Sequence, residues 1–189
     1  MKKIIIIDNY DSFTYNLVHI VRELGYPIDI FRNDKITVEE VSKYDKIILS
    51  PGPGIPDEAG ILKQVVRELG ASKSILGVCL GHQGIAELYG AMLFNIPQVL
   101  HGVTSQLKVI NGHEKLFKGL PKEFKVTHYH SWAVLPESIP VELEVTAING
   151  DGLVMAIAHK NLDVRGVQFH PESVMTEHGK AIMKNWIEN

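Results

Sequence analysis

Only one cysteine, Cys79, occurs among the 189 residues of this sequence. A single cysteine excludes an internal disulfide, and it excludes the Cys-x-x-Cys pairs that bind metals or carry out redox chemistry. We therefore expect a cytoplasmic protein, because a lone thiol can act as a nucleophile in that reducing compartment. Long apolar runs are missing too. No segment approaches the roughly 20 apolar residues of a membrane span, and the run at residues 4–7 is too short for a signal peptide.

Excess basic charge is also absent. The 19 lysines and arginines are outnumbered by 22 aspartates and glutamates, which gives a formal net charge of −3 at pH 7. Because no basic cluster is present either, we expect neither a nucleic acid nor a membrane surface as a partner. The sequence has no internal repeat, low-complexity tract or long linker. We predict one domain over residues 1–189, large enough to bury about 70% of its unfolded surface.

Strand and helix patterns alternate in the first part of the chain. Apolar, β-branched runs predict buried strands over 3–8, 28–31, 46–50 and 74–78. Apolar residues at helical spacing predict helices over 13–24, 61–69 and 80–88, and Thr37-Val38-Glu39-Glu40 matches a capping box. This alternation predicts a doubly wound, mainly parallel sheet with helices packed on it.

The alternation of strand and helix patterns ends after Ala91. Strand-like segments follow with few helical stretches between them, at 93–94, 106–110, 125–127, 142–146 and 153–157. Asn111-Gly112 and the run at 149–152 have the composition of hairpin turns, which favours antiparallel pairing. A strand over 164–169 and a helix from about Glu177 to Glu188 complete the chain. We predict an α/β fold with an open, mixed, mainly parallel sheet and a small antiparallel extension after residue 90.

Cys79 stands in the stretch Gly77-Val78-Cys79-Leu80-Gly81, directly after a predicted strand. Gly-x-Cys-x-Gly is the thiol version of the nucleophile elbow, in which a strand turns sharply into a helix. The flanking positions need glycine because a Cβ would clash in the turn. The helix N-terminus favours the reactive thiolate. The alternative is a small buried residue at a strand end, since free cysteine is commonly buried; these residues alone leave both interpretations open.

His170-Pro171-Glu172 follows another predicted strand and supplies candidate partners for the thiol. Residues i and i+2 of an extended chain point to the same side, and Pro171 favours extended geometry at His170. This arrangement suits an imidazole that deprotonates a thiol while a carboxylate orients it. The alternative is a strand-end turn with a solvated glutamate. The elbow at Cys79 favours the catalytic interpretation.

Pro51-Gly52-Pro53-Gly54 lies at the carboxyl end of a neighbouring strand, the edge where open α/β sheets place their sites. Its backbone N–H groups can be left free to face a ligand. Together with the N–H of Leu80, that of Gly54 would form an oxyanion hole, in which one donor typically contributes about 3 to 4 kcal/mol of transition-state stabilisation. The alternative is an ordinary rigid loop.

Other polar residues have structural explanations that we favour. His128 and His130 have strand spacing suited to chelation, but no third ligand is evident, so we predict no metal site. His82 is expected to pack rather than to act as the base. Asp8 and Asp11 resemble the acidic pocket that holds Mg²⁺ in phospho-receiver domains, but helix capping and loop hydrogen bonds explain them better.

Three motifs together resemble those of the class I, or triad, glutamine amidotransferase family, and the resemblance covers essentially the whole chain. They are Pro51-Gly52-Pro53-Gly54, Gly77-Val78-Cys79-Leu80-Gly81-His82-Gln83 and His170-Pro171-Glu172-Ser173. The resemblance implies a flavodoxin-like fold and hydrolysis of the side-chain amide of L-glutamine. Cys79 would attack the carbonyl carbon, His170 would be the base and then the acid, and Glu172 would orient His170. Implied substrate contacts come from Gln83 and from backbone groups at Gly52, Gly54, Leu80, Ser131 and Trp132.

The segments 8–17 and 129–131 are similar to the glutaminase subunits of anthranilate synthase and aminodeoxychorismate synthase. That similarity implies a partner, a chorismate-binding synthase chain that takes up the ammonia and needs Mg²⁺, whereas no cofactor is expected in this chain. We expect anthranilate, for tryptophan biosynthesis, as the product. The alternative is aminodeoxychorismate, for folate biosynthesis, or service to both. His128 stands where an Arg is usual and Val103 where a Lys is common, and both departures bear on partner contacts and exact substrate.

Two interpretations compete with a glutaminase subunit. One is a different cysteine hydrolase on a related α/β fold, either a peptidase or a γ-glutamyl hydrolase. The other is a non-catalytic binding subunit or a receiver-like regulatory domain built on the same sheet. Whether a glutamine-analogue electrophile labels Cys79 separates the second from the enzymes, because only a reactive thiol is labelled.

Overall fold

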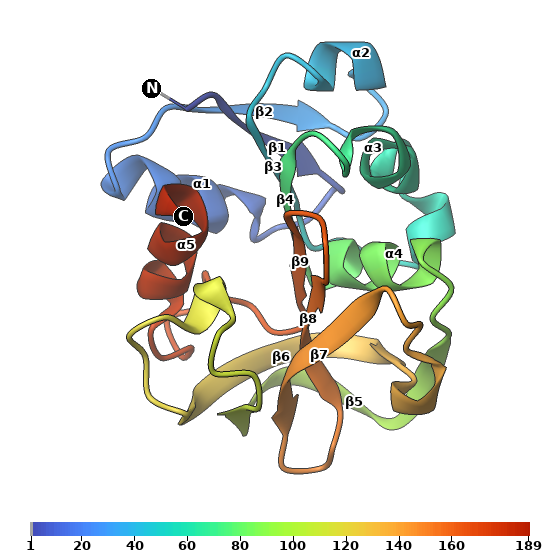
Figure 1. Ribbon diagram of the computed structural model, residues 1–189, viewed down its shortest axis with the longest axis vertical. Helices are drawn as coiled ribbons and strands as arrows, with labels where there is room; N and C mark the ends of the chain where they lie inside the picture. The colour runs from blue at the N-terminus through green and yellow to red at the C-terminus, as the bar shows by residue number, and fades with distance from the viewer. Residues whose placement is uncertain (1) are drawn as a thin grey trace.

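The computed structural model describes residues 2–189, in which a nine-stranded sheet carries helices on its faces (Figure 1). In chain order the strands are β1 Ile4–Asp8, β2 Ile28–Arg32, β3 Lys46–Leu49, β4 Ser74–Val78, β5 Leu93–Val109, β6 Glu123–Val134, β7 Leu143–Asn149, β8 Val154–His159 and β9 Val164–Val167. The helices are α1 Thr14–Glu23, α2 Val38–Val41, α3 Leu62–Leu69, α4 Leu80–Leu88 and α5 Gly179–Glu188. Short 3-10 turns are η1 Pro56–Glu58, η2 Lys115–Phe117 and η3 Pro136–Ser138. Across the sheet the order is β2-β1-β3-β4-β9-β8-β7-β5-β6.

The first five strands of that order, β2-β1-β3-β4-β9, are parallel. Alternate residues of β1 enter different cores: Ile4 and Ile6 pack with α1 and α5, whereas Ile5 and Ile7 pack with α3 and α4. Figure 1 shows α1 beside α5 on one side of these strands and α3 and α4 on the other. A strand covered on both faces needs apolar side chains at successive positions, as β1 has from Ile4 to Ile7 before it ends at Asp8. The doubly wound parallel sheet predicted from the alternation is confirmed.

The remaining strands form the antiparallel extension expected after residue 90. The prediction of separate short strands at 93–94 and 106–110 is wrong, because β5 runs without interruption and pairs with β6 along most of its length. Its register shifts between Asn95 and Leu100 and again between His101 and Val103. Irregularities of this kind let a strand bend past turn-forming residues and continue.

The hairpin predicted from the run at 149–152 is present between β7 and β8, and the Asn149 side-chain oxygen accepts from the backbone N–H groups of Asp151 at 3.1 Å and Leu153 at 2.9 Å. Asn111-Gly112 does not form a two-residue hairpin, because η2 lies between β5 and β6. The last helix begins at Gly179 rather than near residue 177. His178 has a φ of 61°, which interrupts helical geometry just before it.

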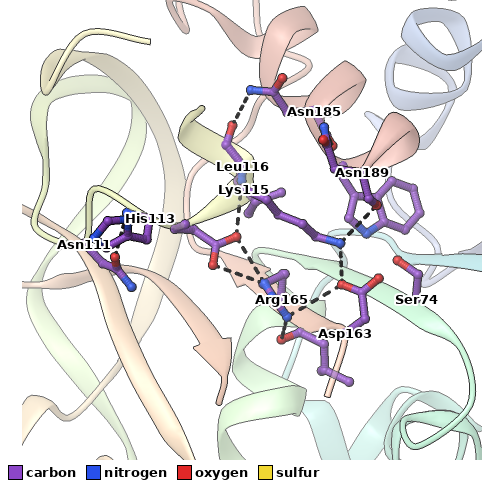
Figure 2. A network of polar contacts seen from close by, with 12 residues as sticks. Ser74, Asn111, His113, Lys115, Leu116, Asp163, Arg165, Asn185 and Asn189 are labelled. Carbon is purple, nitrogen blue, oxygen red and sulfur yellow. Dashed lines mark hydrogen bonds and ion pairs between the residues drawn. The ribbon is translucent and has the colours of Figure 1, made fainter. Parts of the chain in front are cut away.

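A polar network fixes the first residues of β9 (Figure 2). It lies at the amino-terminal ends of the parallel strands, opposite their carboxyl ends. Arg165 Nε lies 3.1 Å from both carboxylate oxygens of Glu114, and Lys115 pairs with Asp163 at 2.5 Å. Lys115 Nζ also donates to the backbone oxygen of Asn189 at 3.3 Å, which ties η2 to the end of α5. Because β9 leads directly to residues 168–172, this network holds the strand that carries the candidate base.

None of the described helices is long and apolar enough to cross a membrane.

Candidate active site

Cys79 occupies the sharp turn between β4 and α4, with φ 52° and ψ −100°. A non-glycine residue is seldom found at positive φ, and such strain persists only where the surroundings enforce it. They do so here: a Cβ on Gly77 would collide with the backbone carbonyl of Gly81, and one on Gly81 would collide with the Leu49 carbonyl oxygen. The two glycines allow strand, turn and helix to pack this tightly. The elbow expected from the spacing is therefore present.

His170 and Glu172 point to the same side, as expected for residues i and i+2. His170 Nδ1 lies 2.6 Å from Glu172 Oε1, and both side chains are almost fully buried. The backbone of His170 is anchored on each side, because its N–H donates to the Thr127 carbonyl at 3.1 Å and its own carbonyl accepts from the Thr176 hydroxyl at 2.7 Å. His170 Nε2 is buried and has no hydrogen-bond partner among the described residues. That nitrogen remains available for proton transfer.

The surroundings of His170 favour its protonated form. Burial lowers the pKa of His170, but the Cys79 thiol and the Glu172 carboxylate outweigh burial and raise the pKa to about 10. The rings of Tyr129 and Phe13 stand edge-on to the imidazole, with centroids 5.0 Å and 5.8 Å away. An imidazolium beside a cysteine stabilises the thiolate, which is the nucleophilic form.

A cavity of about 200 Å³ opens beside the Cys79 side chain. Its lining includes five of the six residues to which substrate contacts were assigned from the sequence: Gly52, Gly54, Gln83, Ser131 and Trp132. The side chain of the sixth, Leu80, is buried in the core with α3 instead. Leu80 can therefore contribute only through its backbone, the role predicted for it.

The loop after β3 reaches the cavity because it packs closely on the loop after β1. A Cβ on Gly52 would lie 2.6 Å from the Asn9 carbonyl oxygen and 2.8 Å from Leu80 Cδ2. Gly54 adopts a φ of 74°, a left-handed conformation that favours glycine. Both glycines are thus needed for the loop to take this path.

One residue of the site, Gln168, was missed by the sequence reasoning, which placed it inside a strand. Its side-chain nitrogen lies 3.5 Å from Cys79 Sγ, and its side-chain oxygen accepts from Gln83 Nε2 at 3.1 Å. Gln83 Nε2 also donates to the Trp132 carbonyl at 2.9 Å. The signal that could have found Gln168 is its position two residues before His170, on the same side of an extended chain.

His128 and His130 form a hydrogen-bonded chain rather than a pair of free ligands. His130 Nδ1 lies 2.8 Å from the Trp132 carbonyl, His130 Nε2 lies 3.2 Å from His128 Nδ1, and His128 Nε2 lies 2.6 Å from the Ser105 hydroxyl. Since a carbonyl only accepts, each neutral ring must carry its proton on Nδ1 and accept at Nε2. Burial and the neighbouring histidines lower the pKa of both rings to about 4. Protonation of His130 would break the chain, because its Nε2–H would then face the Nδ1–H of His128.

The remaining polar residues have the structural roles favoured from the sequence. His82 is fully buried against Gly166 of β9, and burial lowers its pKa to about 3. Asp8 accepts from the Thr14 hydroxyl at 2.8 Å, and Asp11 accepts from the backbone N–H of Phe13 at 2.7 Å. These two aspartates hold the loop that places Phe13 against His170.

Acidification is expected to destabilise the fold in a defined pH window. His82, His128 and His130 stay neutral in the folded protein down to about pH 4, whereas their ordinary pKa is 6.5. Because the unfolded chain binds more protons in this window, the free energy of unfolding falls as the pH drops from 6.5 toward 4. Each histidine contributes up to about 1.4 kcal/mol per pH unit. Urea unfolding at a series of pH values measures the slope.

His128→Gln is the informative variant, because an amide keeps one donor and one acceptor but does not titrate. It should make the dependence of the unfolding free energy on pH shallower, by up to the contribution of one bound proton. The exposed His113 offers a matched control, and His113→Gln should leave the slope unchanged. A His128→Gln slope equal to the wild-type slope would contradict the account of a neutral His128 in the folded chain.

Comparison with known proteins agrees with this geometry. The sequence profile described as "Glutamine amidotransferase class-I" matches residues 5–189. Aminodeoxychorismate/anthranilate synthase component 2 of Bacillus subtilis is 44% identical over 98% of this chain and 95% of its own length. Anthranilate synthase component 2 of Porphyra purpurea is 45% identical over 98% and 99%, respectively. The similarity thus includes the elbow, the loop after β3 and the residues that follow β9.

Two further relatives extend the comparison. The bifunctional protein TrpGD of Thermotoga maritima is 46% identical over 99% of this chain, which spans 32% of that protein. A solved structure described as that of a GMP synthase subunit from Thermoplasma acidophilum has a TM-score of 0.89 and 30% identity, and the alignment covers 99% of this chain and 92% of that one. The order of strands and helices is therefore shared well beyond the site.

Proposed function

This chain belongs to the class I glutamine amidotransferase family, and on that basis we propose that it hydrolyses the side-chain amide of L-glutamine at Cys79 and delivers the ammonia to a chorismate-binding synthase chain. The observation that carries the proposal is the buried His170, held by Glu172 at 2.6 Å, beside a cysteine at a strained strand-to-helix turn. The chain is a homologue of component 2 of the anthranilate and aminodeoxychorismate synthases.

The first half of the reaction forms a thioester. The Cys79 thiolate attacks the amide carbon of the glutamine side chain, and the carbon–nitrogen bond of the tetrahedral intermediate then breaks. The imidazolium of His170 gives its proton to the departing nitrogen, which leaves as ammonia. Glu172 holds Nδ1 of His170, so that Nε2 stays directed at the reacting atoms.

The second half restores the thiol. His170 Nε2, now neutral, takes a proton from water as the water attacks the thioester, and the carbon–sulfur bond breaks to release glutamate. One glutamine and one water thus yield one glutamate and one ammonia. The proposed oxyanion donors in both halves are the backbone N–H groups of Gly54 and Leu80, each typically worth about 3 to 4 kcal/mol. Gln83, Ser131 and Trp132, which line the cavity, are assigned to the amino-acid end of the substrate.

All proton transfers in this scheme use side chains of this chain. We therefore propose that glutamine hydrolysis needs no cofactor or metal here. By family resemblance, Mg²⁺ belongs to the synthase chain, where chorismate binds.

Exposed apolar side chains near the site support docking of the synthase chain over the cavity. Val99 lines the cavity and is 65% exposed, and Val174, two residues after Glu172, is 100% exposed. Met175 and Tyr10 are exposed as well. An exposed valine on the cavity wall and another two positions after Glu172 in the chain favour a covering protein. Such a cover would also keep the ammonia from escaping to solvent.

Glutaminase activity is expected to be low in the isolated chain and to rise at least about tenfold when the synthase chain is added, since docking covers the cavity and strengthens the electrostatic interactions within it. Release of glutamate, followed with and without the co-purifying synthase chain, measures the effect. Val174→Asp should raise the amount of synthase chain needed for activation, whereas Val141→Asp, the same change at an exposed valine just before β7, is the matched control. Equal turnover with and without the synthase chain would refute activation by docking.

We propose anthranilate as the product of the complex. Support comes from the Porphyra relative, whose name specifies anthranilate synthase alone, while the Bacillus relative carries both names. The test is to supply chorismate and amide-labelled glutamine to the complex and to identify the aromatic product by mass. Labelled aminodeoxychorismate instead of anthranilate would overturn this assignment and leave the glutaminase step unaffected.

A further inference from the structure

We propose that Gln168 is a further catalytic residue of this site, whose side-chain amide donates a hydrogen bond to Cys79 Sγ and stabilises the thiolate. The inference rests on the proposed function in one respect, namely that the thiolate of Cys79 is the attacking species. It adds a polar group that contacts the sulfur atom directly, besides the His170 imidazole whose pKa Cys79 helps to raise.

The end of β9 brings Gln168 to the sulfur. The backbone N–H of Cys79 donates to the Val167 carbonyl at 2.8 Å, so the residue after Val167 lies beside the elbow. Gln168 is fully buried, and its own backbone N–H donates to the Met155 carbonyl at 2.8 Å. Its side-chain nitrogen then lies 3.5 Å from Cys79 Sγ, within the range of hydrogen bonds to sulfur.

Alternation along the extended chain adds a second reason for this placement. Gln168 and His170 stand at i and i+2 and share one side of the strand, whereas Phe169 between them enters the core on the other side. One short segment therefore supplies both a proton acceptor and a neutral donor to the same sulfur.

The chemistry of the neighbouring groups determines which end of the Gln168 amide faces the sulfur. The Trp132 carbonyl can only accept, so the Gln83 group 2.9 Å from it must be the NH₂ group. The same NH₂ lies 3.1 Å from the Gln168 side chain, which must present its oxygen there. The NH₂ of Gln168 is left to face Cys79 Sγ. A reversed amide would set two donors against each other.

A donor in this position favours the charged form of the cysteine. Hydrogen bonds to an ionised group are stronger than those between neutral groups, and in a buried site little water competes. Gln168 thus lowers the energy of the thiolate without carrying a charge of its own. Because Gln83 holds the Gln168 amide and also lines the cavity, the substrate-contact residue and the nucleophile are linked through Gln168.

The test uses the fact that Cys79 is the only thiol of the chain. Iodoacetamide alkylation followed by mass, at a series of pH values, gives the apparent pKa of the Cys79–His170 pair in the purified protein. Gln168→Met keeps the size and removes the donor. We expect the apparent pKa to rise by about 1 to 2 units, and alkylation below the wild-type value to slow by about tenfold or more.

Two further variants test whether a shift in the apparent pKa comes from altered packing and not from loss of the hydrogen-bond donor. Thr146→Val is the matched control, because its buried hydroxyl on β7 has no partner among the described residues and its loss should leave the alkylation profile unchanged. Gln168→Asn keeps an amide but draws it back from the sulfur, so it should reproduce the shift of Gln168→Met. Thermal melts establish that each protein is folded.

The outcomes separate this inference from the proposed function. A wild-type alkylation profile in folded Gln168→Met or Gln168→Asn would overturn the role of Gln168, even if glutaminase activity is found. Failure of both variants to fold would also count against it, because Gln168 would then be a residue of the core. A raised apparent pKa in a protein without glutaminase activity would support Gln168 as a donor while refuting the proposed function, since alkylation requires neither glutamine nor the synthase chain.

Discussion

Glutamine-dependent product formation is expected to fall by about four to six orders of magnitude in Cys79→Ala, while formation from added ammonium salt stays at the wild-type level. Without the sulfur no thioester can form, and Gln168 and His170 are left with no group to act upon. In the proposed division of labour the synthase chain uses ammonia itself, so an external supply should bypass the missing step. Product formed from chorismate with glutamine, and then with ammonium, measures both activities in one complex.

The fold should survive this substitution, because alanine keeps the Cβ that the turn already accommodates. Cys79→Gly is a useful comparison, since glycine tolerates the φ of 52° without strain. It should be at least as stable as Cys79→Ala in thermal unfolding and equally inactive with glutamine. Loss of ammonium-dependent synthesis along with glutamine-dependent synthesis would refute the division of labour between the two chains.

The parallel half of the fold and the elbow could be predicted because their signals are local. The run of isoleucines in β1 specifies a strand buried on both faces, whatever follows it in the chain. Gly77 and Gly81 specify a turn too tight for a Cβ, within a few residues of Cys79. His170 and Glu172 are two positions apart, so strand geometry alone directs them to one side.

What could not be predicted depends on contacts between distant segments. Gln168 lies 89 positions from Cys79, and only the pairing of β4 with β9 brings the two together. In the sequence only its position two residues before His170 distinguishes Gln168 from other polar residues within strands. The length of β5 was missed for a similar reason, since it continues through two register shifts by pairing with β6. Local turn propensity was overridden there by partner strands.

His128 shows how a departure from a family pattern becomes interpretable only in three dimensions. A histidine in place of an arginine suggested altered partner contacts. In the structure the ring is buried and hydrogen-bonded between Ser105 and His130, one step from the Trp132 carbonyl that also holds Gln83. His128 therefore affects the cavity indirectly, because it is hydrogen-bonded to His130, which lines the cavity.

Glu172→Gln is expected to lower kcat by about two to four orders of magnitude, because the amide keeps the shape of the carboxylate but loses its charge. The Glu172 carboxylate helps to hold the pKa of His170 above its ordinary value of 6.5. Without it that pKa falls, so the imidazolium that protonates the leaving ammonia is lost at a lower pH. The alkaline limb of the kcat/KM profile should therefore move to lower pH.

The direction of that shift distinguishes an electrostatic role from a packing role. Glu144→Gln, on the exposed face of β7, provides a matched control for the loss of one carboxylate and should leave both the rate and the profile unchanged. If Glu172→Gln lowers the rate but the alkaline limb stays in place, Glu172 acts only by fixing the position of the ring. A shift without a large fall in rate would instead mean that His170 is oriented well enough by its backbone contacts to Thr127 and Thr176. We expect both effects together, because the same 2.6 Å contact supplies the charge and the orientation.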